Sequence, residues 1–140
     1  MIVVATDTEY KLAKKRFKHH IIIKTGVGGI NVVKRLKSLP KWLKIVNFGY
    51  VGSNNLPIGT EVRVGSCKHY HKTEYEENEY LIGSGIKCLT ADEFIEEYQD
   101  KEPVVFDMEL AYILALGFKR VESIKIVSDN LSMKEYESNI

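Results

Sequence analysis

The stretch Ile21-Ile22-Ile23-Lys24-Thr25-Gly26-Val27-Gly28-Gly29-Ile30 joins two structural patterns. Its first three residues form a β-branched apolar run, which is typical of a buried strand. The glycines then permit a tight turn. After the turn, Ile30, Val33 and Leu36 recur at helical spacing until Pro40 ends the predicted helix. A strand, a glycine-rich turn and a helix in this order indicate an α/β fold.

Other segments repeat these patterns on both sides of this unit. Apolar runs predict strands at residues 2–5, 43–46, 103–106 and 124–127. Val62 and Val64 alternate with polar residues, which predicts a strand exposed on one face, and residues 80–89 are expected to pair with it or to continue the sheet. Helices are predicted at residues 109–116 and 132–136, a helix or an ordered turn at residues 9–15, and a turn at residues 47–53. Thr90 followed by Glu93 has the spacing of a capping box, so another helix is expected to begin there. The alternation predicts a mixed, largely parallel central sheet flanked by helices.

The length and composition fit one ordinary globular domain over residues 1–140. The chain has a mass of 16.0 kDa, close to the usual size of one domain. Hydrophobic residues make up 44% and charged residues 28%, which excludes a disordered or fibrous chain. No stretch approaches the roughly 20 apolar residues of a membrane helix. The apolar N-terminus indicates a strand rather than a signal peptide, so a cytoplasmic location is expected.

The charge balance argues against two classes of partner. The net charge is +1, so neither nucleic acid nor a membrane is expected as a partner. Residues 14–20 form a basic run, interpreted as a solvated helix end, with contact to phosphate or RNA as the alternative. Cys67 and Cys88 lack metal-ligand spacing and are expected to be free thiols, although a disulfide is the other possibility. Neither a metal nor a cofactor is predicted.

Polar and glycine-rich residues follow the predicted strands. In a parallel sheet, ligands bind beyond the carboxyl ends of the strands. The residues at those ends are Asp7, Glu9 and the segments 26–29, 47–53, 107–109 and 128–130. Carboxylates therefore occur at three of the ends, and the sequence predicts a binding site where they meet.

Several motifs occur in an order that resembles a known superfamily. They are Ala5-Thr6-Asp7-Thr8-Glu9, Thr25-Gly26-Val27-Gly28, Asn47-Phe48-Gly49-Tyr50-Val51-Gly52, Leu56-Pro57-Ile58-Gly59-Thr60-Glu61-Val62, Asp92-Glu93-Phe94-Ile95, Phe106-Asp107-Met108-Glu109 and Ile126-Val127-Ser128-Asp129. Together they resemble the nucleoside phosphorylase and nucleosidase superfamily, which contains methylthioadenosine/S-adenosylhomocysteine nucleosidase. The resemblance implies that the chain cleaves the N-glycosidic bond of a purine nucleoside by water, as an N-ribosyl hydrolase.

The resemblance implies a role for each matching residue. Asp129 is expected to protonate or hydrogen-bond the purine N7, with Ser128 supporting it. Glu109 is expected to bind the ribose hydroxyls and stabilise the cationic sugar. Glu9 is expected to position or activate the attacking water.

The substrate-binding set implied by the resemblance is completed by five more residues. Met108 is expected to pack against the sugar and Phe94 to stack on the base. Tyr50, Gly52 and Gly26 are expected at the substrate as well. Tyr50 stands where the superfamily has a small serine, so its ring is expected either to narrow the cavity or to displace the usual substrate.

Each assignment has a structural alternative. Asp129 is also suited to cap the last helix, and Glu109 to be a first-turn acid favoured by the helix dipole. Phe94 and Met108 are by default core residues, and Glu9 an acid on a helix surface. The glycines at 26 and 28 could serve only the turn.

Hydrolysis is favoured over phosphorolysis because phosphate binding calls for arginine. The hexameric phosphorylases of this superfamily carry an arginine at the position of Asn47, and no arginine follows Arg120. A phosphate-dependent phosphorylase and a non-catalytic nucleoside-binding relative remain the alternatives. The chain is shorter than the usual member and lacks its long final helix.

A homo-oligomer, either a dimer or a hexamer, is the expected assembly. The superfamily pairs subunits near the active site. Apolar residues at 70–81 and 110–116 are expected to need cover from a second copy.

Overall fold

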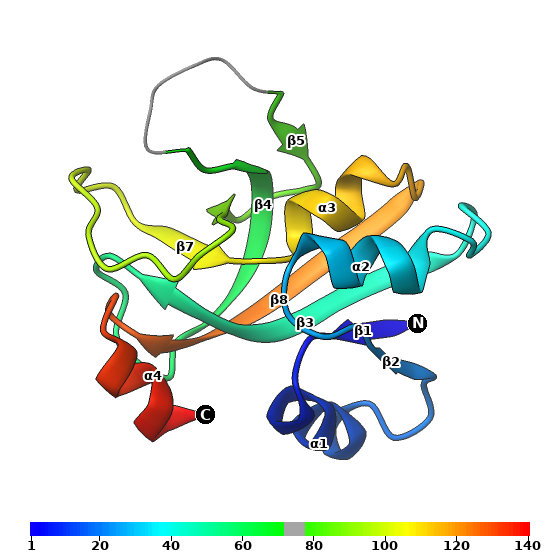
Figure 1. The fold of residues 1–140 in the computed structure, drawn as a ribbon, viewed down its shortest axis with the longest axis horizontal. Coiled ribbons are helices and arrows are strands. Elements are labelled where there is room, and N and C mark those ends of the chain that lie inside the picture. The colour runs from blue at the N-terminus through cyan, green and yellow to red at the C-terminus, as the bar shows by residue number, and fades with distance from the viewer. Residues whose placement is uncertain (72–77) are drawn as a thin grey trace.

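The structure is a computed structural model that describes residues 1–71 and 78–140. The apolar runs form one sheet, and the amphipathic segments between them form helices (Figure 1). The strands are β1 (Ile2–Val4), β2 (Ile22–Lys24), β3 (Lys44–Ser53), β4 (Glu61–His69), β5 (Tyr80–Leu81), β6 (Ile86–Thr90), β7 (Val104–Asp107) and β8 (Arg120–Asp129). The helices are α1 (Asp7–Arg16), α2 (Gly29–Leu36), α3 (Leu110–Ala115) and α4 (Met133–Asn139).

The sheet is mixed, and part of it closes on itself. The strand order is β2-β1-β3-β7-β6-β4-β5, and β8 pairs with both β3 and β4. The strands β3, β7, β6, β4 and β8 therefore form a ring. Five of the pairings are parallel, and β3–β7, β4–β5 and β4–β8 are antiparallel. The predicted α/β class with a mixed sheet is confirmed, whereas the closure is not visible in the sequence pattern.

The two longest strands extend beyond their predicted ends. β3 continues through residues 47–53, so the prediction of a turn there is wrong. It stays extended because it pairs with β8 from Lys44↔Arg120 to Gly52↔Asp129. Phe48 and Val51 are buried within it. The long pairing carries the glycines of β3 up to the end of β8, where the candidate site lies.

Helix α1 begins at a capping box that the sequence contains but that was not assigned. Thr6 is the N-cap, and its side chain accepts a hydrogen bond from the Glu9 backbone N–H. The Glu9 carboxylate in turn accepts one from the Thr6 N–H at 3.3 Å. This reciprocal pair satisfies two donors at the helix start and fixes Glu9 beside β1.

Helix α2 presents a different face to the core from the predicted one. Val32 and Leu36 are fully buried, whereas Ile30 is 74% exposed and Val33 is 37% exposed. The helix also ends at Leu36, before Pro40. Of the three residues whose spacing predicted this helix, Leu36 therefore enters the core, and Ile30 and Val33 form an apolar strip at the surface.

The helix predicted to begin at Thr90 is absent from the described residues between β6 and β7. Thr90 is the last residue of β6. Its hydroxyl donates to Asp107 Oδ1 at 2.5 Å and accepts from the Ala111 N–H at 3.0 Å. The side chain expected to cap a helix at residues 90–93 is thus used in a buried polar network.

Apolar residues at 70–81 and 110–116 were expected to need cover from a second copy of the chain, and the structure tests part of this expectation. Leu110, Ala111 and Ile113 of α3 are fully buried within the chain and need no cover from a second copy, whereas Leu114 and Leu116 are half-buried. Leu81 in β5 is 81% exposed. Part of the predicted 70–81 patch, residues 72–77, lies outside the described residues.

Cys67 and Cys88 are free and buried, opposite each other in β4 and β6. No helix in the described part of the chain has the length and apolarity to cross a bilayer.

Candidate functional site

A cavity of about 260 Å³ opens at the carboxyl ends of β1, β3, β7 and β8. Seven of the nine predicted site residues line it, although they come from segments far apart in sequence. They are Glu9, Tyr50, Gly52, Phe94, Met108, Glu109 and Asp129. The structure thus brings the three predicted acids, Glu9, Glu109 and Asp129, to one cavity.

Glu9 is held by two backbone donors, one from the residue that follows β1 and one from β3. Its Oε1 accepts from the Ala5 N–H at 2.8 Å, and its Oε2 accepts from the Tyr50 N–H at 2.8 Å. The residue is only 7% exposed. A Cβ at Gly49 would lie 2.6 Å from Glu9 Oε2, so only glycine leaves room for the carboxylate. The alternative of a surface acid is therefore wrong.

Glu109 reaches across the cavity to the loop before α2. Its Oε2 accepts from the Gly28 N–H at 2.8 Å. Its side chain does not cap α3, since the Leu110 N–H donates instead to Asp107 at 2.7 Å. Burial, followed by the charge of Asp107, raises the pKa of Glu109 to about 7. This carboxyl therefore changes its protonation state near neutral pH.

Asp129 is fully buried at the end of β8. Its Oδ1 accepts from the Ser128 hydroxyl at 2.8 Å, and its Oδ2 accepts from the Leu131 N–H at 3.0 Å. Burial raises the pKa of Asp129 although these donors act to lower it. Helix α4 is capped by Ser132, whose side chain accepts from the Glu135 N–H. Asp129 is thus not the N-cap of that helix.

Aromatic and apolar side chains cover the acids. Phe94 and Met108 are half-buried and line the cavity, so they are not core residues. The ring centroids of Phe94 and Tyr136 lie 5.8 Å apart. Tyr136 lies in α4 and was missed by the sequence analysis, because an aromatic residue in a short terminal helix carries no distinctive signal. These rings give the cavity flat apolar walls suited to a planar ring.

Two predicted residues do not line the cavity. Ser128 lies behind Asp129, where its hydroxyl holds the carboxylate. Gly26 has a φ of +92°, and a Cβ there would meet the Asn31 side chain at 3.2 Å. The geometry of Gly26 therefore fits the alternative that it serves the turn.

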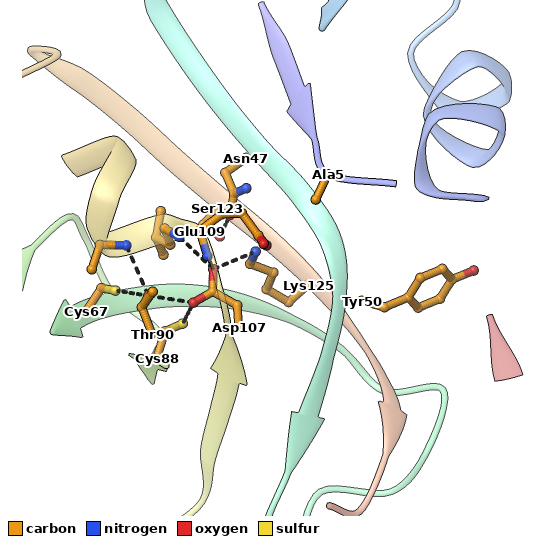
Figure 2. A network of polar contacts seen from close by, with 12 residues as sticks. Ala5, Asn47, Tyr50, Cys67, Cys88, Thr90, Asp107, Glu109, Ser123 and Lys125 are labelled. Carbon is orange, nitrogen blue, oxygen red and sulfur yellow. Dashed lines mark hydrogen bonds and ion pairs between the residues drawn. The ribbon is translucent and has the colours of Figure 1, made fainter. Parts of the chain in front are cut away.

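A buried charged network lies beneath Glu109 and was also missed (Figure 2). Asp107 Oδ2 accepts from Lys125 Nζ at 3.3 Å, and its Oδ1 accepts from Thr90 and from Cys88. Burial acts to lower the pKa of Lys125, but the charge of Asp107 and other nearby acids raises it overall. The available signal was a lysine inside the apolar run of residues 124–127.

Cys88 belongs to the same network. Burial, followed by the hydrogen bond with Cys67 and the charge of Asp107, raises the pKa of the Cys88 thiol well above its usual value. The thiol therefore stays protonated and acts as a donor to Asp107 at 3.3 Å.

The ionisable side chains that line the cavity are acidic. Five carboxylates line it, since Glu93 and Asp107 join the three predicted acids, and no Lys or Arg among the described residues does. Within the same residues, no group of three or more His, Cys, Asp or Glu side chains could hold a metal ion. The wall can therefore donate or accept protons, accept hydrogen bonds from hydroxyl groups and stabilise a cation.

Comparisons with known proteins identify the fold. No known family profile matches the sequence, and no curated protein matches it. Solved structures do match. A variant of MTAN from Chlamydia trachomatis aligns with a TM-score of 0.79 at 16% identity, covering 99% of this chain and 87% of that one.

Two further structures give the same result. The Chlamydia trachomatis MTAN bound to MTA aligns with a TM-score of 0.79 at 15% identity, with 99% and 87% coverage of the two chains. The Helicobacter pylori 5′-methylthioadenosine/S-adenosylhomocysteine nucleosidase (MTAN) aligns with a TM-score of 0.76 at 12% identity, covering 99% and 89%. This chain therefore has the fold of these nucleosidases, as the motifs predicted.

Proposed function

We propose that this chain hydrolyses the N-glycosidic bond of a purine nucleoside. The observation that carries the proposal is the convergence of Glu9, Glu109 and Asp129 on one cavity. Two of the solved structures with this fold are MTAN bound to MTA and to adenine. An adenine nucleoside bearing a 5′ thioether is therefore the first substrate class to test.

The reaction needs an acid at the base. Breaking the bond between the sugar C1′ and the purine nitrogen leaves the bonding electrons on the purine and positive charge on the sugar. Asp129 gives its proton to the purine N7 as that bond breaks. Burial raises the pKa of Asp129, which favours the protonated form that an acid needs. Ser128 fixes the orientation of the carboxyl.

The other two carboxylates act at the sugar. Ionised Glu109 accepts hydrogen bonds from the ribose hydroxyls and stabilises the developing cation. Glu9 positions the water that attacks C1′ and takes up one of its protons, so that the new C–O bond releases the sugar with its 5′ substituent still attached. Phe94 stacks on the purine and Met108 packs against the sugar.

Water is favoured over phosphate as the nucleophile because of the charge on the cavity wall. Among the described residues no Lys or Arg side chain lines the cavity to bind a phosphate ion, and Lys125, which lies beneath it, is already paired with Asp107. Asn47, at the position where phosphorylases carry arginine, is buried in β3, where its Oδ1 accepts from the Ser123 hydroxyl at 2.9 Å.

The direct test is release of free base from a panel of nucleosides with and without phosphate. We expect release from a 5′-thioether adenosine in the absence of phosphate. Asp129→Asn should lower the rate by roughly 10²- to 10⁴-fold. The control is Asp100→Asn, which removes an exposed carboxylate outside the cavity and should leave the rate unchanged.

Three outcomes would contradict the proposal. Release that requires phosphate would mean phosphorolysis, and ligand binding without release would mean a binding protein. Equal rates for Asp129→Asn and the parent would remove Asp129 from the chemistry. Calorimetric binding of adenine to the Asp129→Asn protein checks that the cavity is intact.

We further propose a homo-oligomer. Val27 lines the cavity and is 47% exposed, and Ile30 and Val33 continue this apolar strip along α2. A second copy packed on the strip would help to close the cavity. Sedimentation equilibrium should show a species larger than 16.0 kDa, and Ile30→Lys should shift it to the monomer.

A further inference from the structure

The positive charges of this chain are concentrated in one part of the sequence. Residues 11–44 contain eleven of the 20 Lys and Arg residues and not one Asp or Glu. The remaining residues are correspondingly acidic. The net charge of +1 conceals this division, and the expectation that the chain has no membrane partner rested on that net value.

The fold gathers much of this charge at one end of the sheet. Helices α1 and α2 both return from the cavity toward the starts of the parallel strands. The segments before these strands are joined by hydrogen bonds from Ile2 N–H to Ile21 O at 2.8 Å and from Lys119 N–H to Lys41 O at 3.0 Å. The Met1 ammonium also donates to Lys44 O at 3.1 Å.

These segments form what we call the basic end. It comprises Lys14, Lys15, Lys18, Lys37, Lys41, Lys44, Lys119 and Arg120. In Figure 1 the N-terminus, the turn after α2 and the turn before β8 lie at the same end of the molecule, and α4 lies at the other.

Few of these cations are neutralised by the chain itself. Among ion pairs between described residues, Lys44 is the one member of the group that has a partner, Glu122 at 3.0 Å. Lys41 is half-buried over the Phe118 ring, and the other members are exposed. The basic end therefore presents positive charge to an outside partner.

Two large apolar side chains project among these cations. Ile21 is 69% exposed in the turn that follows Lys18, and Trp42 is 67% exposed between Lys41 and Lys44. Exposed tryptophan and aliphatic side chains surrounded by lysine are the composition of surfaces that lie in the headgroup region of a bilayer.

We propose that the basic end docks on an anionic lipid surface. The lysines are attracted to the acidic headgroups, and Trp42 and Ile21 enter the boundary between headgroups and acyl chains. Nucleic acid would also attract the cations and could stack on Trp42, but it offers no apolar environment for Ile21. The cavity lies at the opposite ends of the strands, so it remains open to solution when the basic end is docked.

Vesicle binding followed by the fluorescence of Trp42 tests this proposal, since the chain has one tryptophan. Vesicles of phosphatidylcholine with roughly 30% phosphatidylserine should shift the emission to the blue and sediment with the protein. Pure phosphatidylcholine vesicles should do so far more weakly, and raised salt should reverse the binding.

Two double charge reversals provide a matched comparison. Lys15→Glu with Lys18→Glu removes charge from the basic end and should weaken vesicle binding by at least about tenfold. Lys101→Glu with Lys134→Glu changes the net charge equally, but these exposed residues lie outside the basic end, so binding should change much less. Ile21→Ser should weaken binding without changing the charge.

The outcomes separate the possible partners. Absence of binding to anionic vesicles, or equal weakening by both double reversals, would overturn the proposal. Tighter binding to a single-stranded or duplex oligonucleotide than to the vesicles would overturn it in favour of nucleic acid. None of these measurements depends on nucleoside cleavage, so this proposal and the proposed function can fail separately.

Discussion

The two ends of the sheet carry charge in opposite ways. At the carboxylate end, which contains Glu9, Glu109 and Asp129, the acids are largely buried and each accepts hydrogen bonds from the protein. At the basic end, the lysines are mostly exposed and few have a partner. The same strands thus begin at a solvated surface and finish at a fixed, desolvated site.

This difference separates two kinds of recognition. Buried acids held by backbone N–H groups keep one geometry, which a small substrate requires. Exposed lysines on flexible stems suit a partner whose charges are spread over a surface. Substitutions at the carboxylate end should therefore lower the free energy of unfolding strongly and depend on one another. Those at the basic end should lower it little, and their effects should add.

The largest effect should come from Lys125→Met beneath the cavity. It removes one partner of a buried ion pair and leaves Asp107 buried without its cation, which typically costs about 3 to 5 kcal/mol. Urea denaturation would measure the loss of unfolding free energy. Adding Asp107→Asn to Lys125→Met should recover part of the loss. A loss below about 1 kcal/mol for the single variant would mean that the pair does not matter to stability.

The next effect concerns the pH dependence set by Glu109. Its pKa is about 7 in the folded chain and 4.5 in the reference state, so between these values the folded state binds the extra proton. The unfolding free energy should therefore fall as pH rises from about 4.5 to 7, by at most about 3 kcal/mol relative to Glu109→Gln. Denaturation of both proteins across this range tests the sign. Parallel curves would show that the carboxyl is not perturbed.

A smaller effect is expected from Gly49→Ala. The new methyl group would press on Glu9 Oε2, and such crowding typically costs about 1 to 3 kcal/mol. In a Glu9→Ala background the same change should cost almost nothing, since the clashing atoms are gone. A double-mutant cycle of unfolding free energies measures this coupling. Equal costs in both backgrounds would place the strain elsewhere.

The smallest effect should be that of Lys44→Met at the basic end. Its ion pair with Glu122 is about half exposed on both sides, and such pairs contribute roughly 0 to 1 kcal/mol. The substitution is the matched control for Lys125→Met, because both remove a lysine from an ion pair in a strand. If Lys44→Met lowered the free energy of unfolding as much as Lys125→Met, buried and exposed ion pairs would not differ in the way proposed for the two ends.

The sequence predicted the buried strands because each contains a short apolar run. Once the strands are placed along the chain, the residues at their carboxyl ends are known as well. The convergence of Glu9, Glu109 and Asp129 was predictable for this reason, with the motif resemblance supplying their roles. The pairing of β8 with both β3 and β4 was not predictable. It depends on contacts between residues distant in sequence, which no local pattern reports.

The errors share one physical cause. Thr90 has the local signature of a helix cap, but its hydroxyl serves Asp107, a residue seventeen positions away. Residues 47–53 are rich in glycine because Glu9 and Asp129 approach Gly49 and Gly52, and not because the chain turns. Lys125 lies within an apolar run, and its role in a buried ion pair was not predicted because its partner, Asp107, lies on another strand. In each case tertiary contacts override local preference.

The closed ring of β3, β7, β6, β4 and β8 limits how the cavity can change shape. Tyr50 pairs with Ile126 of β8 and donates its N–H to the Glu9 carboxylate, and Asp129 pairs with Gly52 of β3, so neither residue can shift without breaking these contacts. The segment 91–103 and α4 lie outside the ring, and they supply Phe94 and Tyr136. Adaptation to a different base, by evolution or by design, should therefore begin at these two aromatic rings.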